Sequence, residues 1–232
     1  MSILDLSTSC LSKIEIDGSR LLAYYVSVEE PQSFDLTGIT GLDCSSNCLT
    51  SLPNNLPENF VFLECYDNFL VELPPLPKSL KELSCPNNKL TTLPELPEGL
   101  TSLICYNNGL TSLPKGLPEN LIILECSNNN LKELPDPLPS RLEELLFHGN
   151  EVTGLPDFLP ASLTTFWCYN NPLKYIPFWK TRPKGLVVSL KDQHRYSVKN
   201  YLEGYRRQKI TRYLFLTFFA TEGLQLDFLD LP

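Results

Sequence analysis

The sequence predicts a solenoid of short repeats, with a parallel β-sheet on the concave face, an extended polyproline-like convex face and an α-helical C-terminal cap. Three observations lead to this fold class. An asparagine recurs every 20 or 21 residues, a leucine and a cysteine precede it at fixed distances, and Leu-Pro pairs follow it. With 42% hydrophobic and 20% charged residues, the 232-residue chain also has the composition of a folded globular protein.

The repeats are aligned by a column of asparagines. Its members are Asn47, Asn68, Asn88, Asn108, Asn129, Asn150 and Asn171. Three residues before each asparagine lies a second column, formed by Cys44, Cys65, Cys85, Cys105, Cys126, Phe147 and Cys168. The unit reads L-x-x-L-x-C-x-x-N-x-L-x-x-L-P, and its seven copies over residues 36–177 share one register, which excludes a chance pattern.

Each part of the unit predicts a local structure. The L-x-C segment alternates with period two, so we expect a short strand whose leucine and cysteine point inward. The asparagine follows where the chain turns, and its amide can pair with backbone groups that would otherwise be buried without partners. Replacing one asparagine with alanine is expected to cost ~1–3 kcal/mol for this reason. The prolines fix φ and lack an N–H, which favours an extended return segment over a helix.

The start of the chain departs from the repeat. Leu4–Ile14 matches Leu42–Leu52 position for position, with Ser9 in place of the asparagine. The array is then interrupted, with a predicted turn at Asp17-Gly18. Because the end of a solenoid core must be shielded from water, residues 1–35 are predicted to form an N-terminal cap that contains a degenerate repeat.

Residues 178–232 are predicted to form a C-terminal cap. It would hold a last strand at Leu186–Leu190, followed by one or two helices, because apolar residues recur with helical spacing over 191–221. The run Tyr213–Phe219 is apolar on too many sides for an isolated end cap. It supports an alternative role for the chain as a structural or assembly component, either a homo-oligomer or a particle-associated protein, that docks through this segment.

The cysteine column is interpreted as packing. The chain has no C-x-x-C pair and no histidine near the column, so the usual spacing of zinc ligands is missing. Thiols on adjacent parallel strands point the same way, which disfavours disulfide torsions. Phe147 occupies one position of the column, which a packing site tolerates and a ligand site does not. Buried thiols of this kind fit a reducing compartment, and we expect no metal and no cofactor.

A protein is the predicted partner, and the outward positions of the strands are its predicted site. Side chains flanking the inward leucine and cysteine should point out from the concave face. Several are apolar or aromatic without a structural need, and glutamates border them, which favours a partner with basic rim charges. The predicted partner-binding residues are Phe62, Glu64, Tyr66, Glu82, Ile104, Tyr106, Ile123, Glu125, Glu144, Leu146, His148, Trp167 and Tyr169. The apolar members among them, including Leu146, are expected to be exposed, unless the caps or a second copy of the chain cover this face.

The charge distribution argues against nucleic acid as the main partner. The net charge is −8, and residues 36–177 hold seven basic and sixteen acidic side chains. A phosphate backbone requires clustered lysine and arginine, which only the short segment 178–232 supplies, with ten basic and five acidic side chains.

A cytoplasmic location is predicted from two features of the sequence. The longest apolar run, Tyr213–Ala220, is too short to span a bilayer, and the first residues do not form a secretory signal.

The L-x-x-L-x-C-x-x-N-x-L spacing, combined with L-P-x-x-L-P, resembles the bacterial-type leucine-rich repeat, the short proline-marked class of the YopM/IpaH effector group. The resemblance covers residues 36–177 and departs from the group in its cysteine preference and in both caps. It implies a leucine-rich-repeat solenoid that acts as a non-catalytic protein-binding scaffold. A host-directed effector, acting in the host cytoplasm, is one role that it implies.

No enzyme activity and no small-molecule substrate are predicted. No Ser-His-Asp set, phosphate-binding glycine loop or paired acid site stands out in the sequence. Some members of the effector group carry a ubiquitin-ligase domain after the repeats, which requires a nucleophilic cysteine. No cysteine follows Cys168, so the sequence argues against that activity.

Overall fold

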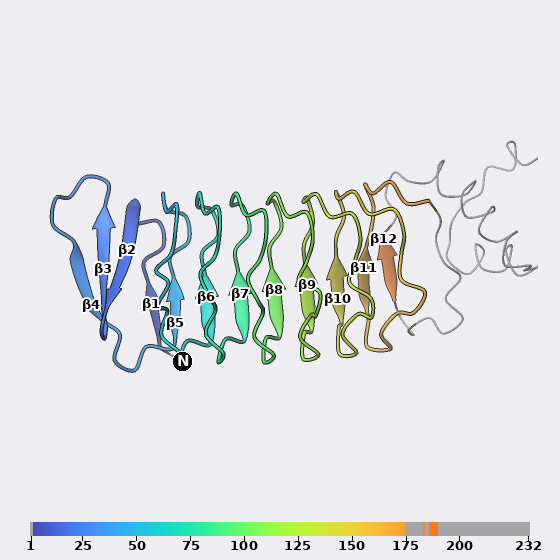
Figure 1. Cartoon of the computed structure of the whole chain (residues 1–232), viewed down its shortest axis with the longest axis horizontal. Coiled ribbons are helices and arrows are strands. Elements are labelled where there is room, and N and C mark those ends of the chain that lie inside the picture. The colour runs from blue at the N-terminus through green and yellow to red at the C-terminus, as the bar shows by residue number, and fades with distance from the viewer. Residues whose placement is uncertain (1, 175–182, 184–185, 190–232) are drawn as a thin grey trace, which may run out of the picture.

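A nine-stranded parallel sheet runs along the molecule, and each coil of the chain adds one strand beside the previous one (Figure 1). The computed structural model describes residues 2–174, 183 and 186–189. In spatial order the strands are β1 (Ile3–Asp5), β5 (Gly41–Asp43), β6 (Phe62–Glu64), β7 (Glu82–Ser84), β8 (Ser102–Ile104), β9 (Ile123–Glu125), β10 (Glu144–Leu146), β11 (Thr165–Trp167) and β12 (Val187–Ser189). The predicted solenoid with a parallel sheet is confirmed.

The repeat spacing sets the register of this sheet. The middle residues of β5–β11 are paired from strand to strand, and they are Leu42, Leu63, Leu83, Leu103, Leu124, Leu145 and Phe166. None of them is more than 1% exposed, and the cysteine column beside them is completely buried. At the one position where the column holds Phe147, its ring meets Phe166 edge-on, with 5.3 Å between the ring centroids. The core therefore consists of a leucine ladder and a cysteine ladder that run the length of the stack.

The asparagine column ties each coil to the one before it. The side-chain amide of Asn129 donates hydrogen bonds to the carbonyl oxygens of Cys126 and Ser127 in its own coil and of Cys105 in the preceding coil, each at 3.1 Å. Its Oδ1 accepts from the Leu110 N–H of the preceding coil at 3.0 Å. The other members of the column repeat this arrangement. One side chain thus satisfies four backbone groups that the interior removes from water.

The residue before each column asparagine adopts a left-handed backbone conformation that turns the chain out of its strand. These residues are Ser46, Asp67, Asn87, Asn107, Asn128, Gly149 and Asn170, with φ between 52° and 67°. Asparagine, aspartate and glycine tolerate this conformation better than other residues. A Cβ at Gly149 would also meet Oδ1 of Asn128, so a side chain there would require that amide to shift.

A small antiparallel sheet lies at the N-terminal end of the stack (Figure 1). Its strands are β2 (Leu11–Asp17), β3 (Arg20–Tyr25) and β4 (Gln32–Asp35), and Gly18 makes the turn between the first two with φ of 58°. Inward side chains of β2 and β3, among them Leu11 and Leu21, are buried in the same apolar cluster as the repeats. The small sheet therefore extends the core beyond β1, which pairs with β5.

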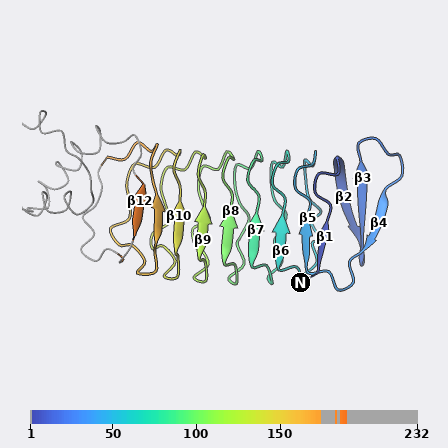
Figure 2. The same cartoon turned by 180° about the vertical axis from the view of Figure 1, so that it is seen from behind.

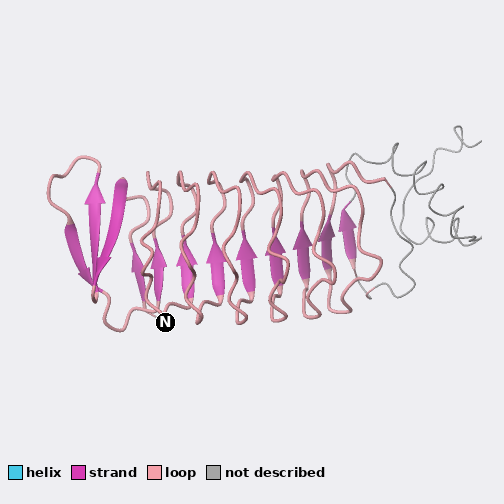
Figure 3. Ribbon diagram, viewed as in Figure 1, coloured by secondary structure: helices cyan, strands magenta, loops and turns pink. Residues whose placement is uncertain are grey.

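From β5 to β11, the return segments between strands contain neither helix nor strand (Figures 2 and 3). None of the described residues belongs to a helix that could cross a membrane. The segment in which a last strand was expected contains β12, which pairs with β11. The predicted helical C-terminal cap and the apolar run Tyr213–Phe219 lie outside the described residues.

Candidate functional site

The outward side chains of β1 and β5–β11, with the residue that follows each column cysteine or phenylalanine, form one surface, which we call the strand face. Strand pairing aligns these side chains in rows that run across the coils. The row between the inward leucine and cysteine positions contains Asp5, Asp43, Glu64, Ser84, Ile104, Glu125, Leu146 and Trp167. The strand face thus changes from acidic at β1 and β5–β7 to apolar and aromatic at β10 and β11.

The N-terminal part of the strand face concentrates negative charge. Asp5, Asp43 and Glu64 are neighbours in one row, and Glu82 pairs with Phe62 in the adjacent row. Partial burial raises the pKa of Glu64, and the charges of Asp43, Glu82 and Asp5 raise it further. Carboxylates that repel one another in this way favour a cationic ligand, because it would neutralise them.

The C-terminal part of the strand face carries three rings in contact, His148, Trp167 and Tyr169, which we call the aromatic cluster. The His148 ring stacks on Tyr169 with 4.3 Å between centroids and 17° between planes. The centroid of the Trp167 ring lies 6.0 Å from the centroid of His148 and 6.4 Å from that of Tyr169. Nδ1 of His148 is hydrogen-bonded to Oγ of Ser127 at 2.8 Å, which fixes the orientation of the ring. Burial lowers the pKa of His148, so the cluster is an uncharged aromatic platform at neutral pH.

Carboxylates also accompany the aromatic end of the strand face. Glu125 pairs with Leu146 and lies on the coil before His148, whereas Glu144 lies on the coil of His148 itself and pairs with Thr165. Burial raises the pKa of Glu125, and the neighbouring charge of Glu144 adds to the effect. Aromatic rings beside carboxylates suit a guanidinium or ammonium group, which can contact both at once.

Most of the predicted partner-binding residues keep part of their side chains accessible on this surface, but Leu146 does not. The expectation that Leu146 is exposed is wrong, since only 9% of it is accessible. Its partners in register are Glu125 and Trp167, so it lies between two side chains on coils about 4.8 Å apart. Phe62 is half-buried for a related reason, because its ring lies over Gly41, where a Cβ would come within 3.0 Å of the Phe62 Cβ.

Among the strand-face residues that were not predicted site residues, Asp5, Asp43 and Ser127 contribute to the two features described above. Asp5 and Asp43 extend the acidic row that contains Glu64, and Ser127 holds the His148 ring. The repeat alignment contains the signal that identifies them, because each occupies the same position of the unit as a predicted neighbour.

Burial makes the column thiols poor nucleophiles. Burial raises the pKa of Cys85, Cys126 and Cys168 to about 12, and it raises the pKa of the other column cysteines as well. A thiol that stays protonated at neutral pH is a poor nucleophile and a poor metal ligand. Within the described residues, no group of three or more histidine, cysteine, aspartate or glutamate side chains is placed to hold a metal ion.

Replacing Glu64 with glutamine is expected to raise the melting temperature at pH 7 by about 1–3 °C, the effect of a partly screened surface charge. The folded state raises the pKa of this carboxyl above its usual value of 4.5, so the folded protein bears the cost of its charge at neutral pH. The cost disappears as the pH falls through the folded pKa towards 4.5. In thermal melts from pH 7 to pH 4.5, the difference in melting temperature between the two proteins should therefore decrease as the pH falls.

Glu72→Gln is the matched control, since Glu72 is an exposed glutamate outside the strand face. Its melting temperature should differ little from that of the wild type across the same range. If Glu64→Gln melts at a lower temperature than the wild type at pH 7, the charge of Glu64 does not destabilise the folded protein.

Comparison with known proteins finds similarity in structure. No family model matches the chain, and no curated protein matches its sequence. The leucine-rich-repeat domain of a Shigella effector is 31% identical with a TM-score of 0.57, over 75% of this chain and 70% of that one. YopM from Yersinia enterocolitica WA-314 is 31% identical with a TM-score of 0.52, over 66% of this chain and 37% of YopM. The functional domain of InlJ from Listeria monocytogenes, which includes a cysteine ladder, is 25% identical with a TM-score of 0.56, over 72% of this chain and 43% of that one.

Proposed function

This chain belongs to the leucine-rich-repeat family of short bacterial repeats that includes the Shigella effector domain, and we propose that it is a non-catalytic scaffold that binds a protein partner through the strand face. The likeness to the Shigella effector domain and to YopM also supports a host-directed effector role, which would place the protein in the host cytoplasm. The chain spans 37% of the YopM chain, so the partners of that protein are not transferred to this one.

The aromatic cluster is the observation that carries the proposal. Core positions of the repeats are filled by the leucine and cysteine ladders, whereas Trp167 and Tyr169 remain partly accessible on the opposite side of the strand. Tryptophan and tyrosine surrounded by polar residues are typical of interface hot spots. Glu125 and Glu144 beside them, and the acidic row beyond, favour a partner segment in which lysine or arginine side chains flank an apolar anchor.

Trp167→Ala is expected to weaken partner binding about 30-fold or more, the loss typical of a hot-spot residue of at least ~2 kcal/mol. The partner is first captured from a candidate host lysate with the wild-type protein and identified by mass spectrometry. Its dissociation constant is then measured for the wild type and the variant by titration. Leu146 is left intact in this experiment because it is buried, and its removal would also lower stability.

Phe158→Ala is the matched control for the loss of an aromatic side chain. Phe158 is 81% exposed and lies between β10 and β11, outside the strand face. The control should bind as tightly as the wild type. If Trp167→Ala retains full affinity with an unchanged melting temperature, the strand face is not the binding surface.

A further inference from the structure

Two cysteines lie outside the buried column, and the repeat register places them on neighbouring coils at the same position. Leu4 pairs with Leu42 in the sheet, and the same offset in sequence relates Cys10 to Cys48. Both side chains are exposed, in contrast to the buried thiols of the column. The pair therefore belongs to the degenerate first coil and the first complete repeat.

Hydrogen bonds carry this alignment beyond the strands to the cysteines themselves. Oδ1 of Asn47 accepts from the Ser9 N–H at 3.1 Å and from the Leu11 N–H at 2.8 Å, which holds the residues on either side of Cys10. The Cys48 N–H donates to the Leu11 carbonyl at 2.9 Å. The backbone at Cys10 is thus fixed beside the backbone at Cys48. Neighbouring parallel chains lie about 4.8 Å apart, within the Cα separation of about 4.4–6.8 Å that a disulfide spans.

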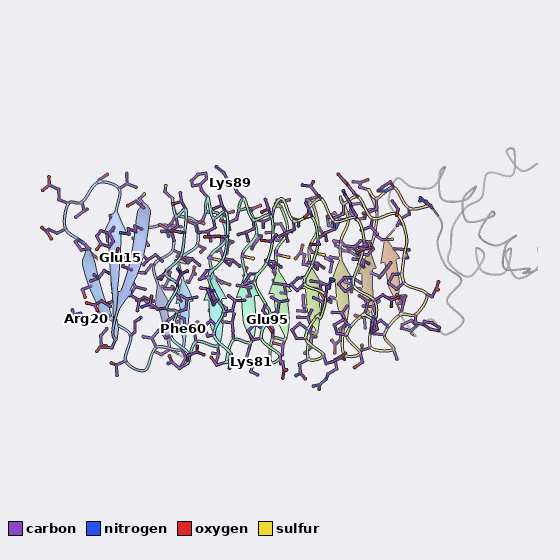
Figure 4. All side chains as sticks on the ribbon, in the orientation of Figure 1. Glu15, Arg20, Phe60, Lys81, Lys89 and Glu95 are labelled. Atoms are coloured by element: carbon purple, nitrogen blue, oxygen red, sulfur yellow. The ribbon has the colours of Figure 1, made fainter. Side chains whose placement is uncertain are left out.

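Side chains at this position of the unit reach those of the next coil. Phe69 and Lys89 occupy the corresponding position in the next two repeats, and Nζ of Lys89 lies 5.0 Å from the centre of the Phe69 ring. Figure 4 shows Lys89 at the edge of the stack where the chain leaves the strands. The geometry that keeps the buried thiols parallel does not apply to Cys10, because Cys10 has φ of 57° whereas Cys48 has no positive φ.

We propose that Cys10 and Cys48 form a thiol-oxidation site that closes to an intramolecular disulfide in the presence of a small-molecule disulfide such as oxidised glutathione. The thiolate of one cysteine attacks a sulfur of oxidised glutathione, forms a mixed disulfide and releases one reduced glutathione. The thiolate of the other cysteine then attacks the protein sulfur of the mixed disulfide and releases the second. The protein dithiol is oxidised, the small disulfide is reduced, and the two thiol protons end on two glutathione molecules.

This disulfide would crosslink the N-terminal coil to the first complete repeat. The enclosed loop, residues 11–47, contains β2, β3 and β4, so the crosslink would restrict the unfolded chain at the end of the stack. We expect the oxidised protein to melt roughly 5–10 °C higher than the reduced protein. This site is independent of the strand face and of any partner that binds there.

The test equilibrates the complete chain under native conditions with mixtures of reduced and oxidised glutathione, followed by alkylation, proteolysis and mass spectrometry. The expected product is a Cys10–Cys48 crosslinked peptide, reversed by excess reductant, with the column cysteines unmodified. Cys85 and Cys105 are the internal control, because they share a register on adjacent coils but are buried. Cys48→Ser should yield a glutathione adduct at Cys10 without any crosslink.

Glutathione adducts at both cysteines of the wild type without a crosslink would overturn the proposal, and so would the absence of any reaction. The thermal shift supplies a second readout. The oxidant should raise the melting temperature of the wild type and leave that of Cys10→Ser/Cys48→Ser unchanged. An equal shift in both proteins would contradict a crosslink between these two residues.

Discussion

Replacing Phe147 with alanine is expected to lower the free energy of unfolding by about 3–5 kcal/mol. The Phe147 ring is completely buried, stands in the column that cysteine fills elsewhere, and packs edge-on against Phe166. The hydrogen bonds of Asn150 and Asn171 hold the coils on both sides in place, so neighbouring chains cannot collapse into the cavity. Urea denaturation of the complete chain, followed by circular dichroism, measures the loss.

Phe158→Ala serves as the control here as well, because that ring is 81% exposed. Its effect on the free energy of unfolding should stay within about 0.5 kcal/mol. A loss below about 1 kcal/mol at Phe147 would mean that this coil repacks and that the ring is not a fixed part of the core.

Replacing Asn129 with alanine is expected to cost about 2–4 kcal/mol, more than the sequence alone indicated, because alanine provides none of the four hydrogen bonds of the amide. The Leu110 N–H and the Cys105 carbonyl would lose the bonds that join two coils, in a part of the interior that water does not reach. Denaturation by urea again measures the change. Hydrogen exchange at the Leu110 amide should accelerate more than exchange in distant coils, since the loss is local.

The neighbouring Asn130→Ala separates this effect from the general loss of an asparagine. Asn130 is exposed, and only its backbone N–H is used, in a bond to the Leu110 carbonyl. It should change stability by less than about 0.5 kcal/mol. Asn129→Asp should be no more stable than Asn129→Ala, because it keeps the acceptor for the Leu110 N–H but places a buried carboxylate oxygen against three carbonyl oxygens. Equal stability of Asn129→Ala and Asn130→Ala would contradict the role of the column.

The repeated part of the fold could be predicted because one physical requirement recurs in every coil. A leucine and a cysteine two residues apart define a strand with an inward side, and an asparagine three residues later supplies hydrogen bonds to the turn. The N-terminal sheet could not be predicted in the same way. Its strands, Leu11–Asp17 and the two that follow, occur once, and alternating apolar residues without a repeat do not specify their partners.

The strand face was predictable in outline, and its exposure was not. Alternation along a strand shows that the side chain of Leu146 leaves the core side, but it gives no account of the neighbours in the next coils. Leu146 lies between Glu125 and Trp167 in register, so its burial depends on three repeats together. The stacking of His148 on Tyr169 and its bond to Ser127 likewise depend on distances across coils.

Binding of a partner on the strand face is tested most directly by hydroxyl-radical footprinting of the complete chain, alone and with the captured partner. The oxidation rates of Trp167 and Tyr169, which lie on the strand face, are compared with that of Phe158, which lies outside it. We predict that the partner slows oxidation of Trp167 and Tyr169 several-fold and leaves Phe158 unchanged. Unchanged oxidation of Trp167 and Tyr169 in a saturated complex would contradict the proposed binding surface.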